Sequence, residues 1–222
     1  MAEPLVRLDG VSKTYGDRHV LRDVHIELAR GEVASLTGAS GSGKSTLISL
    51  LAGLAVPDEG RVVFDGDDIV ALDDVARARL RGRRVGIVLQ SGNLIPFLTA
   101  AQNVELATEF ADGDGTGNHR RATDLLVELG VGDRGHHLPR RMSGGEAQRV
   151  AVAVALANEP ELLLADEVTG QLDSVNADQV MGTIFEAGRR RGLTVLFVTH
   201  NHALADRADR RLILDGGEVR ER

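Results

Sequence analysis

Hydrophobic residues along the chain form short runs near both ends and longer helical patterns in the middle. Loose alternation of apolar and polar side chains predicts half-buried strands, and short β-branched apolar runs predict strands that are buried on both faces. By these criteria we expect strands at residues 5–11, 20–28, 33–37, 61–64, 162–165, 194–199 and 211–214. Tyr15-Gly16-Asp17 provides a turn between the first two, and Asp65-Gly66 predicts a hairpin after residues 61–64.

The helical patterns decide how these strands are organised. Residues 44–54 predict a helix that Gly53 and Pro57 close, and residues 99–158 are mostly helical in pattern. The Gly- and Asp-rich stretch ADGDGTGN at 111–118 interrupts them, and we expect it to form a flexible surface loop. Short buried strands separated by helices indicate a parallel sheet. We therefore expect a single α/β domain over 1–222, with a core at 1–90 and 159–222 and a helical subdomain at about 91–158.

Composition narrows the possible partners. The 222 residues include 33 acidic and 26 basic side chains, so the net charge is −7, which argues against a nucleic-acid binder. There is no cysteine, so disulfides and thiolate metal sites are excluded. The longest uncharged run of interest, 85–104, is too polar and broken to cross lipid, and residues 1–10 lack the apolar stretch of a signal peptide. We expect a cytoplasmic location.

A Gly-rich segment follows the predicted strand at 33–37. Residues 38–45 fit G-x-x-x-x-G-K-[ST] and precede a predicted helix, which is the context that this phosphate-binding motif requires. The glycines let backbone N–H groups surround a polyphosphate, the helix N-terminus attracts the same anion, and Lys44 can reach the outer phosphates. A loop that merely turns the chain is the weaker alternative. The expected nucleotide-binding residues here are Gly38, Ala39, Ser40, Gly41, Ser42, Gly43, Lys44, Ser45 and Thr46.

A second phosphate-site element lies at residues 162–167, Leu-Leu-Leu-Ala-Asp-Glu. An apolar strand that ends in an acid places Asp166 to hold Mg²⁺, directly or through water, together with the Ser45 hydroxyl. Glu167 beside the metal could orient or deprotonate an attacking water. An acidic turn after a core strand is the alternative, which the phosphate loop makes less attractive. No Asn-Lys-x-Asp guanine-recognition motif occurs, which disfavours a GTPase.

Residues 142–149, Met-Ser-Gly-Gly-Glu-Ala-Gln-Arg, resemble the signature of ABC-type ATPases, usually written LSGGQ. Further landmarks of that family follow in the expected order over essentially the whole chain. They are Tyr15 as an adenine-stacking aromatic, Gln90 after a strand at 85–89, Leu172-Asp173 as a D-loop, and Val198-Thr199-His200 as a switch-histidine strand.

The resemblance implies a P-loop NTPase fold with a mostly parallel core sheet, an N-terminal antiparallel β-subdomain and an inserted helical subdomain. It implies ATP and Mg²⁺ as cofactors, with Gln90 joining Ser45 and Asp166 at the metal. Glu167 would activate water, and Lys44 and His200 would act on the transferred phosphoryl group. Two identical subunits would face head-to-tail, each presenting Ser143, Gly144, Gly145 and Glu146 to the ATP of its partner.

The resemblance also implies a separate transmembrane permease, with this subunit peripheral on the inner face of the cell membrane. Gln90 and residues 94–99 would border the groove that receives a permease helix. Finer features resemble the lipoprotein-releasing and macrolide-exporting subunits, namely Phe64-Asp65-Gly66, residues 90–96, 98–100 and 103–104, and Ser143 to Glu146. A division-type ABC ATPase that acts as a mechanical or regulatory switch, and a weakly catalytic ATP-sensing module, remain alternatives.

Four positions depart from the family pattern. Val168 stands where a proline is usual, Val154 where an arginine is common, Ala147 where a glutamine is usual and Gln102 where an acid is usual. Without the fixed φ of a proline, the turn that places Glu167 could be looser. None of the four is an expected catalytic residue, so we expect ATP hydrolysis to survive and the effect to fall on coupling.

Overall fold

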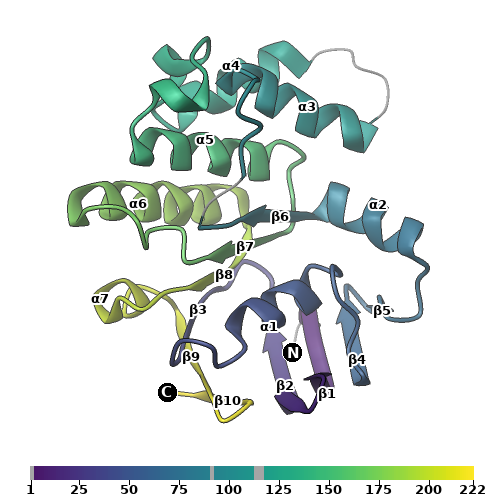
Figure 1. Cartoon of the computed structure of the whole chain (residues 1–222). Helices are drawn as coiled ribbons and strands as arrows, with labels where there is room; N and C mark the ends of the chain where they lie inside the picture. The colour runs from purple at the N-terminus through teal and green to yellow at the C-terminus, as the bar shows by residue number, and fades with distance from the viewer. Residues whose placement is uncertain (1–2, 91–92, 113–117) are drawn as a thin grey trace.

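The computed structural model describes residues 3–90, 93–112 and 118–222, and it contains two β-sheets (Figure 1). The first sheet is antiparallel with the order β2–β1–β4–β5. Its strands are β1 (Val6–Tyr15), β2 (Arg18–Leu28), β4 (Glu59–Phe64) and β5 (Asp67–Asp68). The two-residue turn at Asp65-Gly66 has positive φ at both positions, 54° and 86°, as the predicted hairpin requires.

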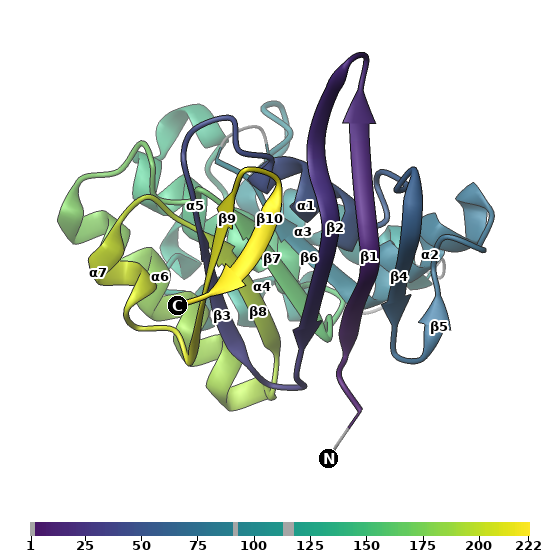
Figure 2. The ribbon, with the colours of Figure 1, turned by 90° about the horizontal axis from the view of Figure 1, so that it is seen from below.

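The second sheet has the order β10–β9–β3–β8–β7–β6, and all its strands except the antiparallel β10 run parallel. They are β3 (Val33–Thr37), β6 (Val85–Val88), β7 (Leu162–Asp166), β8 (Thr194–Val198), β9 (Arg210–Asp215) and β10 (Glu218–Glu221). Figure 2 shows β10 beside β2, where Arg22 N donates to Gly217 O across the two sheets. The predicted fold class, a mostly parallel sheet with an N-terminal antiparallel one, is confirmed.

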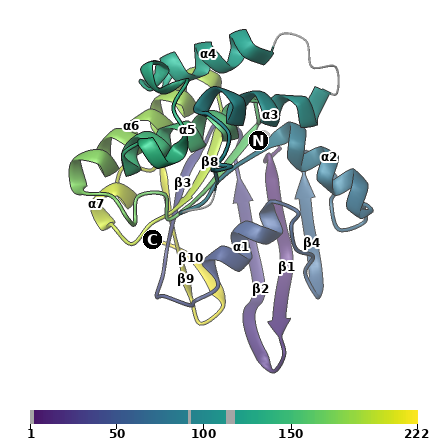
Figure 3. The same ribbon diagram turned by 45° about the horizontal axis from the view of Figure 1, so that its top comes forward.

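Helices cover both faces of the parallel sheet. They are α1 (Lys44–Leu51), α2 (Asp74–Arg84), α3 (Ala100–Asp112), α4 (Asn118–Glu128), α5 (Gly144–Leu156), α6 (Ser174–Arg191) and α7 (His202–Ala205), with 3₁₀ turns η1 (Gly132–Arg134) and η2 (Pro139–Arg141). Figure 1 and Figure 3 show α3 and α4 beside each other, with α5 between them and α6. Helix α3 extends into the stretch predicted as a loop and α4 begins at its last residue; the remainder, 113–117, lies outside the described residues.

Two hydrophobic clusters fill the space on either side of the parallel sheet. Leu163 and Ala165 of β7 join the cluster that contains α5 and α6, while Leu162 and Leu164 join the one that contains α1 and the antiparallel sheet. This division follows from the alternation of side chains along a strand. It explains why residues 162–165 form an uninterrupted apolar run, and it holds β7 in place from both faces.

Across the described parts of the chain, no helix combines the length and the apolar character that a membrane crossing requires.

Candidate functional site

The expected site residues come together because four neighbouring strands present their carboxyl ends at one edge of the sheet. The phosphate loop follows β3, and His200 follows β8. Asp166 ends β7 and Glu167 comes directly after it, while Gln90 follows β6. These strands are consecutive neighbours in the sheet. In open α/β sheets, ligands bind beyond the carboxyl ends of the strands.

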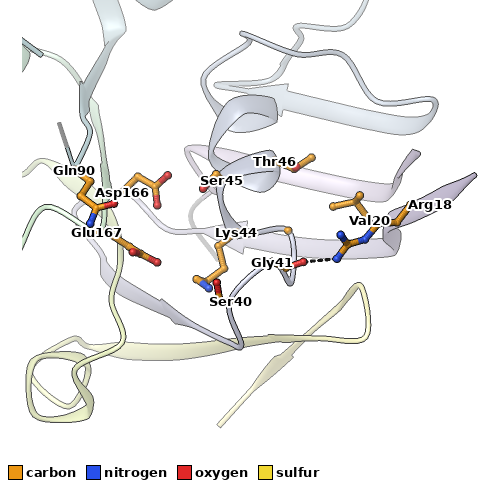
Figure 4. A pocket seen from close by; sticks show the side chains of 11 residues that line it. Arg18, Val20, Ser40, Gly41, Lys44, Ser45, Thr46, Gln90, Asp166 and Glu167 are labelled. Atoms are coloured by element: carbon orange, nitrogen blue, oxygen red, sulfur yellow. Dashed lines mark hydrogen bonds between the residues drawn. The ribbon is translucent and has the colours of Figure 1, made fainter. Parts of the chain in front are cut away.

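A cavity of about 340 Å³ lies at this edge (Figure 4). Its lining joins one side of the phosphate loop to the residues after β6 and β7. The expected residues in this lining are Ser40, Gly41, Gly43, Lys44, Ser45, Thr46, Gln90, Asp166 and Glu167. The other loop residues, Gly38, Ala39 and Ser42, are outside the lining, and two of them hold the lysine in place.

The phosphate loop is folded tightly around its lysine. Lys44 is 5% exposed, and its Nζ donates to the carbonyl oxygens of Gly38 (3.0 Å) and Ala39 (2.9 Å). Gly43 precedes α1 with a φ of 109°, and a Cβ there would lie 2.8 Å from Val20 Cγ1, so only glycine fits. Helix α1 therefore begins at the cavity, and its positive end suits an anion.

One buried polar atom supports the fit of a polyphosphate. Within the described part of the chain, Ser42 Oγ is one of two buried side-chain atoms that lack a hydrogen-bond partner. Buried hydroxyls are normally paired, so an unpaired one within the phosphate loop is consistent with a loop that changes its hydrogen bonds when an oxyanion binds. The loop therefore has the form and the donors that a triphosphate needs.

Oxygen-bearing side chains converge where a metal would meet the phosphates. Burial raises the pKa of the Asp166 carboxyl, while its hydrogen bond with Ser45 and the nearby Lys44 act in the opposite direction. The described residues contain no group of three His, Asp or Glu side chains that could enclose a metal alone. Mg²⁺ takes few protein ligands and completes its shell with water and phosphate oxygens, so Ser45, Asp166 and Gln90 fit it.

Glu167 and His200 form a close pair at the ends of β7 and β8. His200 Nε2 lies 2.6 Å from Glu167 Oε1. The backbone of Glu167 has a φ of 49°, a left-handed value that is uncommon for a residue with a side chain, and its N–H donates to Val198 O. Glu167 lines both the 340 Å³ cavity and a neighbouring one of about 410 Å³ that includes His200. A carboxylate in this position can act on water near the phosphates.

Tyr15 does not share the phosphate-loop cavity. It lies at the end of β1, is 52% exposed, and borders a separate hollow of about 500 Å³ that also contains Leu54 and Val56. The ammonium of Lys13 lies 5.4 Å from its ring centroid, a cation–π contact. The expected stacking of Tyr15 on adenine stays a prediction.

The signature segment also lies away from this cavity. Ser143 caps α5 and forms a capping box with Glu146, and the α5 N-terminus is separated from α1 by the parallel sheet (Figure 1). Gly145 packs so closely against α6 that a Cβ would lie 2.6 Å from Asn176 Oδ1. None of the described residues Ser143 to Glu146 lines the cavity of the chain's own phosphate loop.

Two cavity residues were not expected from the sequence. Arg18 and Val20 of β2 line the phosphate-loop cavity, and Arg18 Nη2 donates to Gly41 O at 2.7 Å (Figure 4). The sequence feature that could have indicated them is the two-residue turn after Tyr15. This turn pairs Tyr15 with Arg18 in the hairpin, so that the start of β2 lies near the phosphate loop.

The four departures from the family pattern are accommodated locally. Val168 is 3% exposed and packs in the cluster of α5 and α6, and Val154 packs partly buried against the same cluster. The amide of Gln102 accepts a hydrogen bond from Thr99 N at 2.9 Å and so caps α3 as an acid would. Ala147 lines a cavity of about 300 Å³ with Gln90.

Comparisons with known proteins show what the chain resembles. A family model described as ABC transporter matches residues 21–170. The chain is 46% identical to the lipoprotein-releasing system ATP-binding protein LolD of Cereibacter sphaeroides, covering 99% of this chain and 100% of LolD. It is 42% identical to the macrolide export ATP-binding/permease protein MacB 2 of Aeromonas hydrophila, but spans 35% of the length of that protein.

A solved structure shows the same fold. The ATP-binding cassette MJ0796, a dimer in a post-hydrolysis state bound to ADP and Pi, matches with a TM-score of 0.90 and 38% identity. The match covers 98% of this chain and 97% of MJ0796. By its matched family model and its relatives, the chain belongs to the ABC transporter family, and it is an ATP-binding ATPase of that family.

Proposed function

We propose that this chain is the ATP-hydrolysing subunit that powers a separate membrane permease. The observation that carries the proposal is the single cavity in which the phosphate loop meets Gln90, Asp166 and Glu167. Phosphoryl transfer needs positioning and charge stabilisation more than covalent chemistry, and these groups supply both. LolD and MacB 2, by their names, serve lipoprotein release and macrolide export, and we propose an export task of this kind.

Each side chain has a defined part in the reaction. Lys44 would bind the outer phosphates, and Glu167 Oε would accept a proton from the attacking water while His200 holds that carboxylate in place. Ser45, Asp166 and Gln90 would hold Mg²⁺, which supplies neutralisation of the charge that develops on the phosphates. The adenine of a bound nucleotide would extend from the phosphate loop to the hollow beside Tyr15 and contact its ring there.

The signature segment would complete the site of a second subunit. Because Ser143 to Glu146 lie away from their own phosphate loop, two copies placed head-to-tail would trap two ATP molecules, with equivalent sites in a C₂ dimer. The solved MJ0796 cassettes are dimeric, which supports a dimer of this chain. Binding of ATP would close the dimer and hydrolysis would release it.

An exposed apolar surface supports docking to a permease. Phe97 is 77% exposed and Leu89 is 41% exposed, and both lie on the connection between β6 and α3. The cavity of about 300 Å³ that Gln90, Leu94 and Pro139 line lies in the same region. A permease helix on this surface would place the subunit on the cytoplasmic face of the membrane and link its movement to Gln90.

The proposal is tested by phosphate release and by dimer formation. Lys44→Ala should abolish ATP-dependent phosphate release, whereas Arg79→Ala, which removes an exposed cation on α2, should leave it intact. Glu167→Gln should bind ATP, form a dimer in size-exclusion chromatography, and turn over about 10²- to 10⁴-fold more slowly, the usual contribution of a general base. Normal phosphate release by Lys44→Ala, or a Glu167→Gln protein that stays monomeric with ATP, Mg²⁺ and its permease, would contradict the proposal.

A further inference from the structure

The N-terminus of α5 carries a negative charge where the proposed function needs a site for an anion. Glu146 occupies the first turn of α5, and its carboxylate accepts a hydrogen bond from Ser143 N at 2.8 Å. This capping box stabilises the helix. An uncompensated carboxylate in the first turn also weakens the positive potential with which a helix N-terminus attracts phosphate.

A cation from another segment lies on this carboxylate. Arg134, the last residue of η1, donates from Nε to Glu146 Oε1 at 2.8 Å, and its Nη1 lies 3.0 Å from Asp133 Oδ2. The backbone N–H of Ser143 and the Arg134 guanidinium both lower the pKa of Glu146, so the carboxylate is ionised at neutral pH. The negative charge of Glu146 is therefore present, and the Arg134 guanidinium forms an ion pair with it.

We propose that Arg134 is a positioning residue that neutralises Glu146 and so keeps the N-terminus of α5 able to accept the phosphate of a partner subunit's ATP. The inference rests on the proposed function, because it assumes that the signature segment contacts that ATP. It also explains how this chain tolerates an acid where the family signature is usually written with glutamine. The Arg134 cation offsets the Glu146 carboxylate in place of a neutral amide, and it also pairs with the more exposed Asp133.

Replacing the Arg134 side chain leaves its backbone contacts in place. Its N–H donates to Val131 O and its carbonyl accepts from His137 N, and both anchor the turn before η2. A glutamine at 134 would therefore remove the charge with little effect on the local backbone. The effect of the substitution can then be assigned to charge.

The test measures the ATP concentration that gives half-maximal dimerisation of the slowly hydrolysing Glu167→Gln protein. Removing the cation in Arg134→Gln should raise this concentration roughly three- to tenfold, as expected for one extra charge at two helix N-termini. Adding Glu146→Gln should restore it, because the Gln/Gln pair is neutral again. Arg134→Lys should retain most of the affinity, and Arg120→Gln, an exposed arginine on α4, serves as the control.

The salt dependence separates charge from structure. The increase in the half-maximal ATP concentration caused by Arg134→Gln should become smaller as sodium chloride rises to about 0.5 M, because screening weakens repulsion between exposed charges. If that concentration stays raised at high salt and in the Arg134→Gln/Glu146→Gln double variant, the inference is overturned. Normal dimerisation of Arg134→Gln would overturn it as well. If the Glu167→Gln protein itself fails to dimerise, the proposed function fails instead.

Discussion

His200 Nε2 lies 2.6 Å from Glu167 Oε1, so the ends of β8 and β7 hold a histidine and a carboxylate in direct contact. The two residues are 33 positions apart along the chain. The contact exists because Asp166 of β7 pairs with Val198 of β8, which sets the two following loops side by side. The unusual positive φ of Glu167 turns its side chain out of the strand, and the histidine then fixes its direction.

Replacing the histidine should therefore slow catalysis more than it weakens ATP binding. We expect His200→Ala to lower kcat by about 10²-fold with a smaller change in KM, because an oriented base contributes at least this much. Steady-state phosphate release over a range of ATP concentrations measures both values. His202→Ala, an exposed histidine two positions further on, should retain both, and wild-type kcat in His200→Ala would argue against a positioning role.

A methyl group at Gly145 should disturb the junction of α5 and α6. The added Cβ would lie 2.6 Å from Asn176 Oδ1 and 3.0 Å from Asn176 Cγ, so Gly145→Ala should destabilise the protein by about 1–3 kcal/mol through overpacking. Gly182→Ala is the matched control: Gly182 lies within α6 with no atom within 4 Å of an added Cβ, and alanine there should stabilise by about 0.5–1 kcal/mol. Urea unfolding of the two variants gives both values, and equal stabilities would contradict the packing described for Gly145.

Loss of the Arg18 side chain should weaken nucleotide binding. Its Nη2 donates to Gly41 O at 2.7 Å, and the residue lines the phosphate-loop cavity, so its charge is close enough to attract a bound polyphosphate. We expect Arg18→Ala to raise the KM for ATP by roughly two- to fivefold with little change in kcat, as one exposed charge-assisted contact would. Arg22→Ala on the same strand is the control, and a change confined to kcat would show that Arg18 acts otherwise.

An ion network far from the cavity should make stability depend on pH. Arg84 contacts Glu161 at 2.5 Å and also Asp65, and these contacts lower the pKa of both carboxyls below their ordinary values. A carboxyl with a depressed folded-state pKa stabilises the protein above its unfolded pKa, and this contribution is lost as the pH falls through the folded-state pKa.

Urea unfolding of the wild type should therefore show that the free energy of unfolding falls as the pH drops below about 5. We expect a fall of about 1 kcal/mol, because the network is partly exposed to solvent. Arg84→Gln should lower the free energy of unfolding mainly at neutral pH, so that it depends less on pH than in the wild type. Arg79→Gln on the same helix should keep the wild-type profile. Arg30 pairs with the same two carboxyls and remains in this variant, so parallel pH profiles for wild type and Arg84→Gln would mean that Arg84 does not set these pKa values.

Local patterns predicted most of the fold, and the misplaced boundaries have physical causes. The helix expected at 44–54 ends at Leu51, since the left-handed Gly53 lies beyond its last turn. The strand expected at 5–11 continues to Tyr15, because the two-residue turn allows pairing up to Tyr15 and Arg18. Alternation alone could not indicate this length, which depends on hydrogen bonds to β2.

The parts of the site that depend on contacts between distant segments of the chain could not be predicted from the sequence. Lys44 and Asp166 could be identified because each stands in a motif beside a strand. The Arg134–Glu146 pair has no motif, since it forms through a 3₁₀ turn whose position depends on the packing of α4 against α5. Tyr15 lies at its own hollow, and its expected role depends on how a bound nucleotide would extend from the phosphate loop.

The separation of Ser143 from the cavity of Lys44 has a kinetic consequence on the proposed pairing. A lone chain would hold half of each site, so the rate per chain in dilute solution would rise with protein concentration. Two subunits tethered to one permease would instead meet at a local concentration in the millimolar range, typical of short connections. The membrane partner would then act as a scaffold that makes hydrolysis independent of how many copies the cell contains.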